Sequence, residues 1–212
     1  MMDYKYHIFI SYRRMDSDWI RWTRDCFKRP LESLLRPALG NIRVFFDEQI
    51  ETGSSWPLRL ATAHARSQIM IPILCRDYFN SDWCRLELAL MYERERKLNY
   101  RSISKPDVLI LPFIIDDGSC FPAEVQDIQS ESIHEFANPF MCKDSPRQEN
   151  FAQHLRTCCG RIEGALQSAP PFDPAWENEN FNYFKDMFRI KLDAHKIVPS
   201  LSLPTSSVLP KP

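Results

Sequence analysis

The feature that most constrains this chain is a regular alternation of short apolar runs with longer segments of helical spacing. Apolar, β-branched and aromatic residues fill residues 6–12, 42–46, 68–74 and 107–115, with a weaker run at 132–136. Runs of this length are typical of strands buried in a parallel sheet. Between them, apolar residues recur every three or four positions at residues 19–27, 57–66, 83–98 and 148–166, which predicts helices. Pro30 and Pro37 are expected to limit or kink the chain after the first helix.

The strand and helix order predicts an α/β fold with a parallel sheet covered by helices on both faces, because right-handed crossovers bury both sides of the strands. Ligands of open α/β sheets bind outside the carboxyl ends of the strands. In this chain those ends are residues 11–14, residue 47 with the loop that follows, residues 75–82 and residues 116–121. We therefore expect any functional site to lie there.

The length of 212 residues suits one domain with an appendage rather than two domains with separate cores. We expect the domain to occupy residues 1–168. A different texture begins with Pro-Pro-Phe-Asp-Pro, and aromatic residues from Trp176 onward predict an added helix within a C-terminal extension over residues 169–198. Residues 199–212 are rich in Pro, Ser and Leu and are expected to be a disordered tail.

Charge and cysteine content exclude several classes of protein. The formal net charge of -1 offers no field that would attract nucleic acid or an anionic membrane. Seven scattered cysteines, an odd number without CxxC pairs, do not form a disulfide framework and suggest a reducing cytosol. No run approaches the roughly 18 apolar residues of a membrane span. A soluble, cytoplasmic protein is expected.

Several familiar catalytic motifs are absent. None of the five glycines falls in a dinucleotide-binding turn or a P-loop, and there is no GxSxG motif. The five histidines are far apart, with no HExxH motif and no cysteine at ligand spacing, so no metal site is expected. Cys158 and Cys159 lie on the apolar stripe of a predicted helix, which favours a place in the core over a nucleophilic role.

One carboxylate stands where a core residue is expected. On a helix that begins near Asp82, Glu87 follows Trp83 by one turn and shares its face with Leu90. In the structural interpretation, Glu87 lies at the margin of the core and pairs with Arg13 or Arg14. In the functional interpretation, Glu87 is a catalytic group. Residue spacing alone does not decide between them.

Three segments together resemble the Toll/interleukin-1 receptor (TIR) domain family. They are His-Ile-Phe-Ile-Ser-Tyr-Arg-Arg at residues 7–14, Arg-Val-Phe-Phe-Asp at residues 43–47 before a glycine-containing loop, and Ser-Asp-Trp-Cys-Arg-Leu-Glu-Leu at residues 81–88. They are similar to the first strand, the BB-loop region and the WxxxE helix of that family, in the same order, and the resemblance covers roughly residues 4–167. It implies a flavodoxin-like three-layer fold around a central five-stranded parallel sheet.

The resemblance also implies a function. TIR domains either serve as self-associating adaptors or cleave nicotinamide from NAD+, and in the enzymes the glutamate of WxxxE is catalytic. This assigns catalysis to Glu87, with NAD+ as the substrate and no separate cofactor. The substrate-binding residues are then expected to be Tyr12, Arg13, Arg14, Asp47, Trp83 and Cys84. The arginines would hold the pyrophosphate or keep Glu87 anionic, and Tyr12 and Trp83 would offer ring faces to a base. Strand-end anchoring and core packing are equally open alternatives for these four.

The loop at residues 48–56 corresponds to the family's usual self-association element, and its candidate residues are Gly53, Ser54, Ser55 and Trp56. The alternative is a plain surface connection. We expect a stand-alone, prokaryotic-type NAD+ nucleosidase that yields ADP-ribose or a cyclic product. The absence of room for a sensor domain suggests antiphage signalling with a separate sensor or effector protein. The competing hypotheses are a non-catalytic TIR adaptor and, less favoured, a relative of nucleoside deoxyribosyltransferases.

Overall fold

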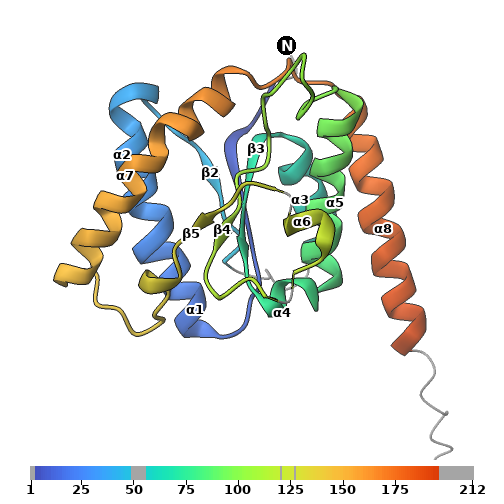
Figure 1. The fold of residues 1–212 in the computed structure, drawn as a ribbon. Coiled ribbons are helices and arrows are strands. Elements are labelled where there is room, and N and C mark those ends of the chain that lie inside the picture. The colour runs from blue at the N-terminus through green and yellow to red at the C-terminus, as the bar shows by residue number, and fades with distance from the viewer. Residues whose placement is uncertain (1–2, 49–55, 120, 127, 196–212) are drawn as a thin grey trace, which may run out of the picture.

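The computed structural model describes residues 3–48, 56–119, 121–126 and 128–195 (Figure 1). In chain order the elements are β1 (Tyr6–Tyr12), α1 (Ser17–Trp22), the π-helix η1 (Thr23–Lys28), α2 (Arg29–Leu39), β2 (Val44–Phe45), α3 (Trp56–Ala65), β3 (Ser67–Leu74), α4 (Arg76–Phe79), α5 (Asp82–Lys97), β4 (Phe113–Ile114), α6 (Ala123–Gln126), β5 (Glu131–Ser132), the 3-10 helix η2 (His134–Phe136), α7 (Pro146–Gln167) and α8 (Ala175–His195).

The five strands form one parallel sheet in the order β2-β1-β3-β4-β5. This is the flavodoxin-like order, with strand 1 between strands 2 and 3. The sheet is built around the long pair β1 and β3, which are aligned from Tyr6 opposite Ser67 to Tyr12 opposite Ile73. The prediction of a five-stranded parallel α/β sheet is confirmed.

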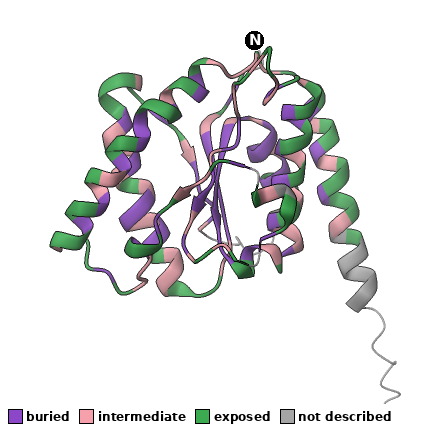
Figure 2. Ribbon diagram, in the orientation of Figure 1, coloured by how far each residue is buried: buried purple, intermediate pink, exposed green. Residues whose placement is uncertain are grey.

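Helices cover both faces of the sheet. Figure 1 shows α1, α2 and α7 on one side and α3, α5 and α8 on the other, and Figure 2 shows buried residues gathered on the sheet and on the helix faces turned toward it. On the first side, aromatic rings pack against one another in the core. They are Trp22, Phe27, Phe113, Phe136 and Phe151. The three-layer prediction is confirmed.

Three predicted strands are shorter than expected. In the run at residues 107–115, Ile110 makes a single bridge to Met70, and only Phe113–Ile114 forms a strand. Pro112 between them has no N–H to donate to a ladder. The run at residues 42–46 pairs only at Val44–Phe45. The last strand is Glu131–Ser132 rather than residues 132–136, because Ile133 leaves the extended conformation (ψ 20°) and starts η2.

Neither proline of the first helical region ends it. Helix α2 follows η1 directly, with Pro30 in its first turn and Pro37 inside it, and ends at Gly40 with a positive φ of 69°. Pro30 directly follows the wider π-helical turn, in which the Arg29 N–H bonds to the Arg24 carbonyl five residues back.

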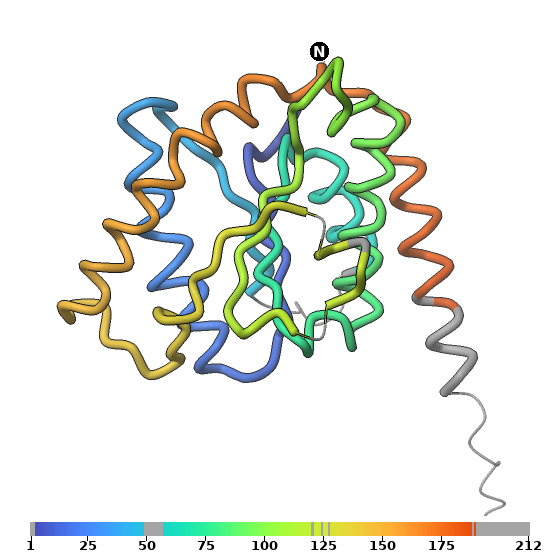
Figure 3. Tube along the Cα trace, in the orientation of Figure 1, coloured from blue at the N-terminus to red at the C-terminus, as the bar shows by residue number. Residues whose placement is uncertain are grey.

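The C-terminal extension turns back onto the domain. The tyrosine hydroxyls of Tyr4 and Tyr100 donate to the carbonyls of Pro170 and Ser168, at 2.9 Å and 2.5 Å, which fixes the connection between α7 and α8. Helix α8 then packs along the outside of α3 and α5 (Figure 3). The predicted tail at residues 199–212 lies outside the described residues. Within them, no helix has both the length and the apolar composition that crossing a bilayer requires.

Candidate functional site

A cavity of about 270 Å³ opens at the carboxyl ends of β1 and β2, beside the start of α5. It is lined by all seven side chains to which the sequence assigned a catalytic or substrate-binding role. These are Tyr12, Arg13, Arg14, Asp47, Trp83, Cys84 and Glu87. Of the other strand ends, Cys75 and Asp116 line a separate hollow. The structure therefore brings the seven predicted residues together, and it leaves their roles as predictions.

Helix α5 places Glu87 in the cavity. Ser81 caps the helix by accepting the N–H of Cys84 at 3.4 Å, and Glu87 follows one turn later. The Glu87 side chain is 6% exposed and accepts a 2.5 Å hydrogen bond from Ser11 Oγ of β1. Tyr78 lies fully buried behind Ser11, with its hydroxyl 2.7 Å from Ser11 Oγ. A buried chain of polar groups thus joins Tyr78, Ser11 and Glu87.

Burial dominates the ionisation of Glu87. Desolvation raises its pKa to about 8, the Asp47 charge adds to this, and the Ser11 hydrogen bond opposes it. The structural interpretation placed an arginine against Glu87. Among the described residues, no ion pair joins Glu87 to an arginine. Arg14 instead pairs with Asp47 at 3.4 Å and donates to the Glu48 carbonyl at 2.7 Å. Glu87 therefore favours the neutral acid at neutral pH.

Tyr12 and Asp47 form the wall of the cavity at the end of β2. The Tyr12 hydroxyl donates to the Asp47 carbonyl at 2.8 Å, and the Tyr12 ring stacks on Phe46 at 4.7 Å. Burial raises the pKa of Tyr12 well above its usual value. Tyr12 is therefore a neutral phenol that anchors the segment after β2, and its substrate-binding role stays a prediction.

Trp83 and Cys84 form the opposite wall. One face of the Trp83 ring is covered by Phe184 of α8, at 5.9 Å between ring centroids and 22° between planes. Cys84 is buried, and its thiol donates to the Tyr12 carbonyl at 3.6 Å. Desolvation, with the Glu87 charge as a smaller cause, raises the pKa of Cys84 to about 12. Cys84 is therefore a neutral thiol that packs the wall, and it is not an activated nucleophile.

Two further residues hold Glu87 from outside the cavity. His64 of α3 is fully buried, with Nε2 2.9 Å from the main-chain carbonyl of Glu87 and Nδ1 2.8 Å from Asn180 Nδ2 of α8. The sequence assigned no role to these two residues or to Ser11. For Ser11 a signal existed, since it is a hydroxyl inside an otherwise apolar and aromatic strand. For Asn180 there was none, because 116 residues separate it from its partner.

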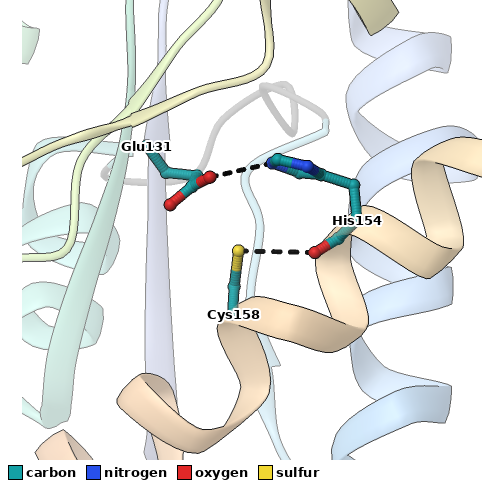
Figure 4. A group of neighbouring side chains, drawn as sticks. All are labelled: Glu131, His154 and Cys158. Carbon is teal, nitrogen blue, oxygen red and sulfur yellow. Dashed lines mark hydrogen bonds and ion pairs between the residues drawn. The ribbon is translucent and has the colours of Figure 1, made fainter.

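A second group of chemically capable side chains lies at the other edge of the sheet. Ligand-type atoms of Glu131, His154 and Cys158 all lie within 4.8 Å of one another (Figure 4). His154 and Cys158 are one turn apart on α7, so the statement that no histidine has a cysteine at ligand spacing is wrong. Glu131 lies 2.9 Å from His154 Nε2 and also pairs with Arg161, which contacts Cys158 Sγ at 3.7 Å. Arg161 already neutralises the Glu131 carboxylate. The expectation that this chain holds no metal stays a prediction.

The self-association prediction falls largely outside the described residues. Gly53, Ser54 and Ser55 are not among them, and of Trp56 only its place at the start of α3 is described.

Comparison with known proteins identifies the family. A model of the TIR domain matches residues 8–140, well over half of the chain. Over 95 residues the chain is 33% identical to Protein SUPPRESSOR OF npr1-1, CONSTITUTIVE 1 of Arabidopsis thaliana. The match covers 45% of this chain and only 6% of that protein.

A similar solved structure is that of the TIR domains of the activated Roq1 resistosome, which directly recognizes the pathogen effector XopQ. The match has a TM-score of 0.37 and 18% identity, and it covers 87% of this chain and 99% of the other. The family match rests on residues 8–140, which contain the WxxxE glutamate and the walls of its cavity. This chain belongs to the TIR domain family.

Proposed function

We propose that this TIR domain cleaves the bond between nicotinamide and ribose in NAD+, with Glu87 as the catalytic residue. The observation that carries the proposal is a buried carboxyl group that lines a cavity together with two arginines. A carboxyl group buried this deeply is costly to ionise and is typical of functional sites.

The chemistry requires one carboxylate. Cleavage of the C1′–N1 bond sends its electron pair to the pyridinium ring, so nicotinamide leaves as a neutral molecule and no acid is needed to protonate it. The ribose develops oxocarbenium character, which the Glu87 carboxylate stabilises. Attack at C1′ by water gives ADP-ribose, and attack by a nucleophile within the same molecule gives a cyclic product. With a pKa near 8, Glu87 is also a suitable base for the proton that the attacking water releases.

The remaining walls suit the rest of the substrate. Arg13 and Arg14 are half-buried at the cavity and carry the positive charge that a pyrophosphate needs. Asp47 already engages Arg14, which leaves Arg13 as the main candidate for a direct phosphate contact. Trp83 lines the same cavity and is the candidate platform for an aromatic base.

The wider setting of the proposal is cytoplasmic antiphage signalling, with self-association through the loop at residues 48–56 and a separate sensor or effector as partner. The alternative is a TIR adaptor that does not cleave NAD+. In that case the raised pKa of Glu87 reflects only burial.

The test is nicotinamide release from NAD+ by concentrated protein, with and without a crowding agent, followed by chromatography of the nucleotide products. Glu87→Gln keeps the size of the side chain and a Ser11 hydrogen bond but carries no charge. The matched control is Glu93→Gln, an exposed position on the same helix. We expect release by the wild type and by the control but not by Glu87→Gln. Equal release by all three would refute the catalytic role, and no release under any condition would favour the adaptor.

A further inference from the structure

Helix α8 packs against α3 and α5 (Figures 1 and 3), and among its described side chains a buried stripe recurs along the helix. Its members, Trp176, Asn180 and Phe184, are spaced four residues apart and are 8%, 4% and 0% exposed. The family match ends at residue 140, so the whole stripe lies outside it. Two of its members, Asn180 and Phe184, contact residues that belong to the site or support it.

Asn180 reaches Glu87 through His64. The carbonyl oxygen of Glu87 is only an acceptor, so the proton of the neutral imidazole must be on Nε2. Nδ1 is then the acceptor, and Asn180 donates to it through Nδ2. Burial lowers the pKa of His64 to about 3, so the ring stays neutral at all ordinary pH values. The chain from Asn180 through His64 to the Glu87 carbonyl therefore has one direction and fixes the main chain of α5 at Glu87.

Phe184 contacts the same helix one turn earlier. Its ring covers one face of Trp83 in a near-parallel stack and also lies 6.4 Å from the His64 ring. Asn180 and Phe184, one turn apart on α8, thus act on Glu87 and Trp83, one turn apart on α5. Farther along α5, Trp176 covers the guanidinium of Arg94 at 4.2 Å.

We propose that Asn180 and Phe184 are positioning residues, which hold Glu87 and Trp83 in the geometry for cleavage and make α8 part of the functional unit. The inference rests on the proposed NAD+ cleavage. Asn180 sets the position of the Glu87 carboxyl relative to the ribose, and its loss lowers kcat. Phe184 sets the plane of the Trp83 ring, and its loss raises KM.

The test uses four variants of the full chain. Asn180→Leu removes the donor and keeps the number and branching of the side-chain heavy atoms, and Asn182→Leu makes the same change at an exposed position of α8. Phe184→Leu removes the stacking ring, and Tyr183→Leu is its control at a side chain that is 58% exposed. Rates are expressed per folded molecule, with the folded fraction taken from urea unfolding at the assay temperature, so that a loss of stability alone does not count.

We expect kcat to fall about tenfold in Asn180→Leu with KM nearly unchanged, because a small misplacement of a catalytic group is costly. KM should rise about fivefold in Phe184→Leu, in keeping with the worth of an aromatic pair. Both controls should match the wild type. If Asn180→Leu and Phe184→Leu both have the kcat and KM of the wild type while Glu87→Gln is inactive, the inference is overturned and the proposed NAD+ cleavage stands.

A second readout does not depend on activity. In the wild type, nitrogen NMR of the His64 ring should show a protonated Nε2 and a bare, hydrogen-bonded Nδ1, and carbon NMR of the Glu87 carboxyl should show its raised pKa. Asn180→Leu should shift the Nδ1 signal and lower the pKa of Glu87 as α5 loosens and water enters. If the wild type releases no nicotinamide, the proposed function fails. The pKa of Glu87 then serves as the test of whether Asn180 positions Glu87. An unchanged pKa in Asn180→Leu would refute it.

Discussion

Replacing Glu87 by Gln should make the stability of this protein less sensitive to pH. Burial raises the pKa of Glu87 from 4.5 to about 8 in the folded chain. Between these two values the folded chain holds a proton on Glu87 that the unfolded chain has released. Stability must therefore fall as pH rises through this window. The amide introduced by Glu87→Gln does not titrate, so the variant should lack this part of the pH dependence.

The magnitude follows from the two pKa values. A tenfold change in a proton-binding constant is worth about 1.4 kcal/mol, so the contribution of Glu87 should decline by about 1.4 kcal/mol per pH unit and by about 5 kcal/mol in all. The advantage of Glu87→Gln over the wild type should be smallest below about pH 4.5, be larger by about 3.5 kcal/mol at pH 7, and level off above about pH 8. Few single substitutions at a buried polar site are expected to stabilise a protein this much.

The assay is urea unfolding of the wild type, Glu87→Gln and Glu93→Gln at about pH 5, 7 and 9, with the free energy of unfolding extrapolated to water. Glu93 lies on the exposed side of the same helix, where Arg96 lowers its pKa, so its variant should follow the wild-type slope. Wild type and Glu87→Gln running parallel from pH 5 to pH 9 would refute the reasoning, since Glu87 would then titrate alike in both states.

Three further outcomes follow. The kcat/KM for NAD+ cleavage, measured by nicotinamide release, should rise with pH and level off above about pH 8, because the free enzyme must lose a proton from Glu87. Ser11→Ala should move that rise to higher pH, since it removes the hydrogen bond that lowers the pKa of Glu87. The same change should lower the free energy of unfolding in urea by about 1–3 kcal/mol, because the Tyr78 hydroxyl loses its hydrogen bond to Ser11. Arg94→Met should cost about 2–4 kcal/mol in the same assay, because Arg94 donates to two buried main-chain carbonyls, whereas Arg96→Met at the surface should be near neutral.

The strand and helix order was predictable because it depends on local patterns. Where the prediction failed, apolar residues are buried without pairing in a ladder. Leu109 and Ile110 are at most 1% exposed, yet they lie outside the two residues of β4. Burial produces the apolar run, whereas a ladder also needs free N–H groups and an extended backbone, which Pro112 and Ile133 interrupt. Sequence hydrophobicity reports the first condition and not the second.

The walls of the site were predictable for a related reason. Parallel strands end at one edge of the sheet, so residues after β1 and β2 must lie near the start of α5. The partner of each charge was not predictable. Glu87 had two candidate arginines, Arg13 and Arg14, and the structure pairs Arg14 with Asp47 and leaves Glu87 to the hydroxyl of Ser11. Asn180 could not be found at all, because no local pattern links α8 to His64.

In the part of the chain that the structure describes, no arginine forms an ion pair with Glu87. The cavity that these residues form therefore holds no fixed partner cation for the Glu87 carboxylate, and a preformed ion pair would change this. The pyridinium ring of NAD+ carries a positive charge, and nicotinamide loses it when the bond breaks. If the substrate supplies the cation, the carboxylate is favoured only while intact NAD+ is bound, and the neutral acid returns once nicotinamide has formed. A fixed guanidinium would stabilise the anion equally before and after cleavage and would compete with the developing oxocarbenium for the same charge. Under the proposed function, burial of Glu87 against Ser11 and Tyr78 and its support by His64 and Asn180 would leave the electrostatic attraction of the carboxylate to the reacting sugar.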